Sequence, residues 1–142
     1  MSLQRDVDYR ERPDLYRVGR GEEGVFRVEP YKTELLPLWR FRTPEAARAS
    51  ADALLARYHA YRAAGDDVGM DMARKYLQMG WSRSLRYAKY PGGRKRTPAG
   101  DPVAQQTWAD PGKRESARIF RAALNEVRAD MAYRDAVGRL AR

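Results

Sequence analysis

Residues 43–90 read TPEAARASADALLARYHAYRAAGDDVGMDMARKYLQMGWSRSLRYAKY, and this stretch predicts two helices joined by a tight turn. Thr43 followed by Pro44 indicates a helix start, because threonine caps the first turn and proline suits the first helical position. Apolar side chains then recur at helical spacing, at Ala47, Ala51, Leu54, Tyr58 and Tyr61. Gly65 is the expected end of this helix.

The second helix is expected to begin at Asp66-Asp67, so close to the first that the two form an antiparallel or angled pair. One face carries apolar and small residues that would let the first helix approach closely, namely Ala73, Tyr76, Leu77, Gly80, Ser84, Tyr87 and Ala88. At about 100° per residue the opposite face is polar and basic, with Lys75, Gln78, Ser82, Arg86 and Lys89. The spacing therefore predicts an amphipathic helix with a basic outer face.

The segment before these helices predicts a β-hairpin. Leu15 to Val18 and Val25 to Val28 each alternate apolar and polar side chains, and a glycine-rich stretch lies between them. Gly19, Gly21 and Gly24 match the spacing of a dinucleotide-binding motif, but that motif requires a helix directly after the third glycine. Because a strand is expected there instead, we expect a hairpin without a nucleotide site.

Residues 90–100 are expected to form a basic Gly/Pro loop, since proline and glycine oppose regular structure. Asp110-Pro111 predicts the start of a further helix. A short last helix is expected to bury Tyr133, Val137 and Leu140. The sequence thus predicts an α+β fold that is mainly helical, with a polar arm over residues 1–13 and a single domain over residues 14–142.

Charge is distributed unevenly along the chain. The 142 residues carry a net charge of +9, and residues 72–100 hold eight basic side chains and no acidic one. A basic block without neutralising acids is typical of a surface that meets a polyanion, most often nucleic acid. The residues predicted to contact phosphates are Arg74, Lys75, Arg83, Arg86, Lys89, Arg94, Lys95 and Arg96. Aromatic candidates for stacking on bases are Trp81, Tyr90 and Trp108.

Several classes of site and protein are excluded. The chain has no cysteine and one histidine, which excludes disulfides, thiol catalysis and Cys-rich or His-rich metal sites. No run is apolar enough for a signal-peptide core or a membrane span. We therefore expect a soluble cytoplasmic protein without metal or cofactor. Its contacts with DNA or RNA are expected to be largely non-sequence-specific, because no known base-reading motif is present.

Two other functions remain open at this point, as does the oligomeric state. An adaptor protein would use the basic face to dock an acidic partner. A phosphate-handling enzyme would use Asp67 and Asp71, which lie one helical turn apart and could share a divalent ion. Capping of the helix start explains these acids more simply.

The stretch from Gly69 to Trp81, GMDMARKYLQMGW, resembles a small bacterial and phage family known as DUF4385, a domain of unknown function. The likeness continues in residues 16–22, 28–32, 38–41, 92–95 and 116–120. It implies a cytoplasmic single-domain protein, and it carries over neither an activity nor a catalytic residue.

Overall fold

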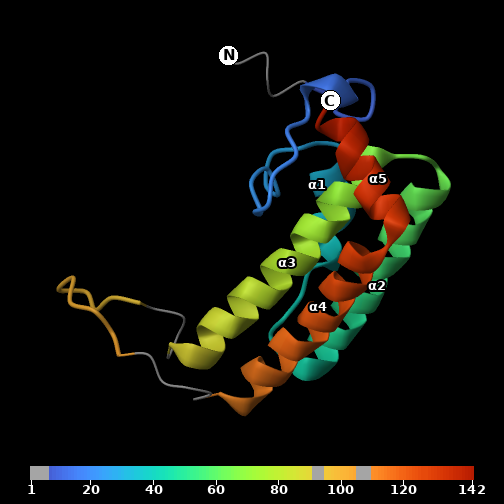
Figure 1. Ribbon diagram of the computed structural model, residues 1–142. Helices are drawn as coiled ribbons and strands as arrows, with labels where there is room; N and C mark the ends of the chain where they lie inside the picture. The colour runs from blue at the N-terminus through green and yellow to red at the C-terminus, as the bar shows by residue number, and fades with distance from the viewer. Residues whose placement is uncertain (1–6, 91–94, 105–109) are drawn as a thin grey trace.

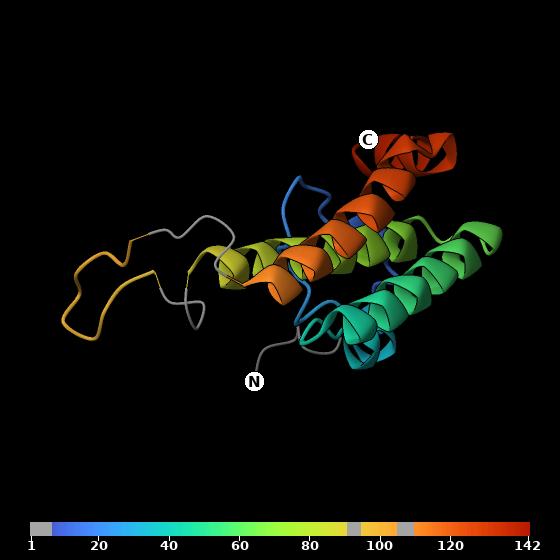
Figure 2. The same ribbon diagram turned by 90° about the horizontal axis from the view of Figure 1, so that it is seen from below.

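The computed structural model describes residues 7–90, 95–104 and 110–142. Three long helices lie side by side, with α3 running back along α2, and a shorter α5 packs across one end (Figure 1, Figure 2). The α-helices of this part of the chain are α1 (Tyr31–Leu35), α2 (Pro44–Ala63), α3 (Asp67–Lys89), α4 (Pro111–Ala129) and α5 (Met131–Leu140). Short 3-10 helices cover Pro13–Leu15 and Leu36–Leu38.

Polar side chains cap the starts of the four longer helices. Thr43 accepts a hydrogen bond from the backbone N–H of Ala46 at the start of α2. Aspartates do the same for the following helices, at Asp66 for α3, Asp110 for α4 and Asp130 for α5. The helix starts predicted at Thr43-Pro44, Asp66-Asp67 and Asp110-Pro111 are thereby confirmed.

Helix α3 is the central element, because it packs against α1, α2, α4 and α5. Every residue from Val68 to Leu77 is buried, whichever side of the helix it faces. Large side chains form the core around it, including Tyr31, Tyr58, Tyr76, Phe120 and Leu124. Other parts of the chain therefore pack against both the polar and the apolar side of this half of the helix.

Gly80 of α3 lies directly under the Phe120 ring of α4. A Cβ atom at this position would lie 2.4 Å from the Phe120 ring. The small residue thus makes room for α4, which comes later in the chain, and not for the preceding helix α2 as the sequence predicts. Periodicity identifies a small-residue face but does not identify the helix that fills it.

The predicted N-terminal β-hairpin is wrong, and so is the α+β class, since the described residues contain helices and no strand. Gly24, with a φ of +93°, starts a turn in which the N–H of Val28 donates to the Gly24 carbonyl at 2.9 Å. Several carbonyl groups between residues 19 and 25 accept hydrogen bonds from side chains of α3. Short alternating runs need a partner for their backbone polar groups. Here the N–H groups of Tyr16, Arg27 and Val28 pair within local turns, and the Val25 carbonyl accepts from the Tyr76 hydroxyl of α3.

The segment 95–104 projects from the end of the bundle where α3 finishes (Figure 1, Figure 2). It turns back on itself, because the N–H of Gly100 donates to the Thr97 carbonyl at 2.9 Å and Arg96 forms an isolated bridge with Pro102. Among the described helices none is both long and apolar enough to cross a lipid bilayer.

Candidate nucleic-acid interface

The basic residues predicted to contact phosphates do not share one surface. Arg74 and Lys75 are buried, at 2% and 3% exposure. Arg83 and Arg86 are exposed on the second half of α3, Lys89 is half-buried at its end, and Lys95 and Arg96 are exposed on the projecting segment. Arg94 and the stacking candidate Trp108 lie outside the described residues.

Arg74 is held by an internal network of polar groups. Its guanidinium donates to the Asp71 carboxylate at 2.8 Å and to the Tyr133 hydroxyl at 2.9 Å. Asp71 also accepts from the hydroxyl groups of Tyr16 at 2.5 Å and Tyr133 at 2.7 Å. Burial and the nearby carboxylate raise the pKa of Tyr16, which keeps this phenol a neutral donor.

The glycine-rich loop completes the shell around Arg74. The two terminal nitrogens of Arg74 donate to the carbonyl oxygens of Gly19 and Gly21, both at 2.7 Å, and to the side chain of Gln78 at 2.9 Å. All directions of the guanidinium fork are occupied by protein acceptors. Arg74 therefore fixes the N-terminal segment onto α3 and offers no donor to a phosphate.

Lys75 faces the same segment from the next position of α3. Its ammonium donates to the Glu23 carbonyl at 2.7 Å and lies 4.7 Å from the centre of the Tyr16 ring. Burial lowers the pKa of Lys75, because desolvation disfavours the charged form. The N-terminal segment also contacts Gln78 and Ser82 farther along the predicted polar face, because Gln78 donates to the Arg20 carbonyl and Ser82 donates to the Glu22 carboxylate. The exposed basic side chains of α3 therefore begin at Arg83.

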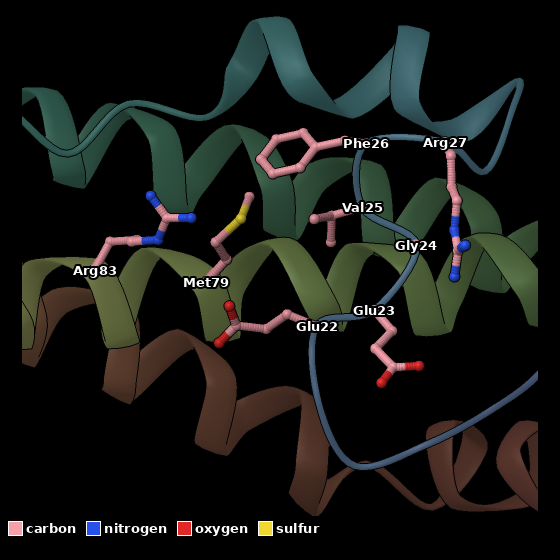
Figure 3. Close-up of a pocket in the computed structure, with 8 residues that line it drawn as sticks. All are labelled: Glu22, Glu23, Gly24, Val25, Phe26, Arg27, Met79 and Arg83. Carbon is pink, nitrogen blue, oxygen red and sulfur yellow. The ribbon is translucent and has the colours of Figure 1, made fainter.

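Arg83 lies on the flank of α3 that faces the loop 22–27. It lines a cavity of about 530 Å³ together with Met79, Phe26 and Glu22 (Figure 3). Figure 3 shows Arg83 and Met79 on α3 and Phe26 on the facing loop, with Arg83 at the left of the labelled side chains. Arg83 therefore lies on a different side of α3 from Trp81 and Leu85, which face α4.

On the opposite flank, α3 and α4 form a groove with arginines along one wall. The groove has a volume of about 370 Å³, and it is lined by Trp81, Leu85, Arg114, Ala117, Arg118, Arg121, Ala122 and Asn125. None of these lining residues is acidic. The guanidinium of Arg121 lies 4.6 Å from the centre of the half-buried Trp81 ring. A flat aromatic surface and three cations thus border one concave site.

Helical spacing places one further predicted residue beside this groove. Lys89 follows Leu85 by one turn on the same side of α3. Arg86 follows Arg83 by three residues and Met79 by seven, which places it on the flank that faces the loop 22–27. Lys95 begins the projecting segment, with its ammonium 5.6 Å from the centre of the Tyr90 ring. We call Trp81, Lys89, Arg114, Arg118 and Arg121 the basic groove face.

The site prediction omitted the arginines of α4. Arg114 and Arg121 lie seven residues apart, with Arg118 between them, and this spacing puts all three on one side of a helix. That signal is present in the sequence. Their approach to Trp81 is not, because it depends on how α4 packs against α3.

Asp67 and Asp71, the residues considered for a divalent ion, are engaged separately. Asp67 accepts from Arg139 at 2.8 and 2.9 Å, whereas Asp71 is fully buried in the Arg74 network. Over the described ranges, no cluster of three or more His, Cys, Asp or Glu side chains is arranged to hold a metal ion. The two carboxylates act as partners of arginines in this fold.

A family model described as a domain of unknown function, DUF4385, matches residues 2–140. The chain belongs to the DUF4385 family. The resemblance seen in the Gly69 to Trp81 stretch is thereby confirmed over nearly the whole chain. Comparison with curated proteins and with solved structures found no match.

Proposed function

We propose that this DUF4385 protein binds nucleic acid through the basic groove face, mainly by contacts with the phosphate backbone. The observation that carries the proposal is the groove itself, where Arg114, Arg118 and Arg121 line one wall beside Trp81 and no lining residue is acidic. Glu115 lies outside the lining, and its carboxylate is 3.7 Å from the exposed guanidinium of Arg118. Arginine suits this task, because its planar fork pairs with phosphate oxygens and stacks on aromatic rings. The proposal includes a cytoplasmic location.

The proposal narrows the set of contacting residues predicted from the sequence. Arg74 and Lys75 are left out because their side chains are buried. Lys95 and Arg96 remain as additional contacts on the projecting segment, which starts near the same end of α3 (Figure 1). Trp81 remains as a stacking residue, with Arg121 already placed against its ring.

Salt dependence of binding tests the phosphate contacts. Fluorescence anisotropy with labelled random-sequence DNA and RNA, single-stranded and duplex, should show affinity falling linearly on a log–log plot against salt. Arg118→Ala and Arg121→Ala should each reduce the slope by about 1, because each removes about one phosphate contact. Arg142→Ala is the matched control, since Arg142 is an exposed arginine at the other end of the bundle.

Two results would contradict the proposal. One is the absence of binding to any of these nucleic acids at low salt. The other is an equal effect of Arg142→Ala and Arg118→Ala, which would mean that net charge alone drives association. Binding of an acidic protein with the same variant pattern, together with no binding to nucleic acid, would favour the adaptor function instead.

A further inference from the structure

A third concave site lies next to the cavity of Figure 3, against the N-terminal segment, and shares the residues 23–24 and 26–27 with it. This cavity has a volume of about 760 Å³, within the usual range for small-molecule sites. Its walls come from residues 7–17, from the loop 23–29, from Lys32 of α1 and from Lys75 of α3. Four separate parts of the chain therefore build it.

The charged lining favours an anion. Arg17, Arg27, Lys32 and Lys75 line the cavity, against two acids, Glu23 and Glu29. The Glu29 carboxylate is already occupied, because it accepts from the N–H and the hydroxyl of Thr33 at 2.8 Å each. The positive lining is thus only partly balanced.

Lys75 is the buried polar group of this cavity. It is 3% exposed, and its ammonium contacts the Glu23 carbonyl and the Tyr16 ring. Among the described residues, no carboxylate lies within ion-pair distance of its ammonium. A buried ammonium without a carboxylate partner is costly. A bound anion would supply the missing charge.

The apolar lining favours a ligand with a hydrophobic part. Leu15 and Phe26 border the cavity although 44% and 50% of their surfaces are exposed, respectively. Tyr9 and Tyr16 add aromatic surface, with their rings packed edge to face at 6.4 Å. A flat apolar group placed here would cover side chains that otherwise face water.

We propose that this cavity binds a small organic anion, with its phosphate or carboxylate beside Lys75 and Arg27 and a flat apolar group against Leu15 and Phe26. The proposal goes beyond nucleic-acid binding and does not depend on it. The two sites use different flanks of α3 and share no lining residue.

Isothermal titration calorimetry with phenyl phosphate and with benzoate tests the inference and distinguishes the two anionic groups. At least one should bind about tenfold more tightly than inorganic phosphate or phenol, each of which offers only part of the ligand, since about 1.4 kcal/mol corresponds to a factor of ten. Phe26→Ala and Arg27→Ala change exposed side chains and should each weaken binding about fivefold or more.

Arg20→Ala is the control, because Arg20 is an exposed arginine of the same segment that does not line the cavity. Lys75→Met should abolish binding. If this buried variant does not fold, Phe26→Ala and Arg27→Ala still test the inference, because they change exposed side chains. The inference is overturned if neither probe binds, or if Arg27→Ala and Arg20→Ala weaken binding equally. Arg118→Ala should leave phenyl phosphate and benzoate binding unchanged, because Arg118 does not line this cavity. The small-anion proposal and the nucleic-acid proposal can therefore fail independently.

Discussion

At the scale of single residues, the least expected feature is the buried pair Asp71 and Arg74, one helical turn apart with 0% and 2% of their side chains exposed. Both charges are tolerated because the network around them is complete. Asp71 accepts from Tyr16 and Tyr133, and Arg74 is surrounded by carbonyl oxygens of the glycine-rich loop. A buried ion pair of this kind is stable only while every member is present.

Removal of one partner should therefore be costly. Arg74→Met is expected to lower the free energy of unfolding by about 3–5 kcal/mol, because it leaves the Asp71 carboxylate buried without a cation. Urea unfolding followed by circular dichroism measures this. The double variant Asp71→Asn with Arg74→Met should recover part of the loss, and a single-variant loss below about 1 kcal/mol would show that the pair contributes little.

At the scale of elements, the contact between α3 and α4 both builds the core and shapes the basic groove face. Phe120 of α4 is fully buried over Gly80 of α3. Arg121, the next residue of α4, reaches Trp81, the next residue of α3. The packing contact between Gly80 and Phe120 therefore sets where Trp81 and Arg121 meet, and with them the position of the groove.

Two glycine substitutions should act in opposite directions. Gly80→Ala should destabilise the protein by about 1–3 kcal/mol, since a Cβ atom 2.4 Å from the Phe120 ring must push the helices apart. Gly138→Ala in α5 has no atom within 4 Å of its added Cβ. It should stabilise by about 0.5–1 kcal/mol through helix propensity. Thermal unfolding compares the two, and a stabilising Gly80→Ala would show that α4 does not approach as described.

At the scale of the whole molecule, the N-terminal segment is joined to the bundle by a second polar cluster. The Glu34 carboxylate in α1 accepts from Arg10 at 2.8 and 3.0 Å and from Arg57 and Tyr61 of α2, both at 2.6 Å. Arg10 also reaches Asp66, the capping residue of α3. One carboxylate thus connects the segment before α1 with two helices.

This cluster predicts a stability that depends on acid pH. The hydrogen bonds from Arg10, followed by that from Tyr61, lower the pKa of Glu34 from 4.5 to about 2. The unfolded chain then binds more protons than the folded one between these values, so stability falls as pH is lowered. The contribution, at most about 3 kcal/mol, is complete above the unfolded pKa and lost by about pH 2.

Urea unfolding from neutral to acid pH checks this expectation with Glu34→Gln. The variant should be less stable at neutral pH and should show a shallower decline on acidification. Glu126→Gln removes an exposed carboxyl group of α4 and serves as the control. Parallel curves for the wild type and Glu34→Gln would contradict the role given to Glu34.

Local signals were sufficient for the starts of α2, α3 and α4, whereas α1 was not predicted. Thr43-Pro44, Asp66 and Asp110-Pro111 each combine a capping side chain with helical spacing of apolar residues, and all three begin helices. The alternating pattern in Leu15 to Val18 and Val25 to Val28 led to the wrong prediction of a β-hairpin. The same pattern also fits a loop that packs against a helix. For the site, the position of charges on α3 was readable, but their burial was not.

The sequence by itself determined where α2, α3 and α4 begin, which face of α3 is apolar, and that basic residues concentrate in one stretch. These features depend on contacts within a few residues. Only the tertiary structure decided that Arg74 and Lys75 point into the protein, whereas the arginines of α4 line a groove beside Trp81. The physical reason is that exposure of a helix face depends on what covers it. Here the N-terminal segment, more than 50 residues away along the chain, covers the first half of α3.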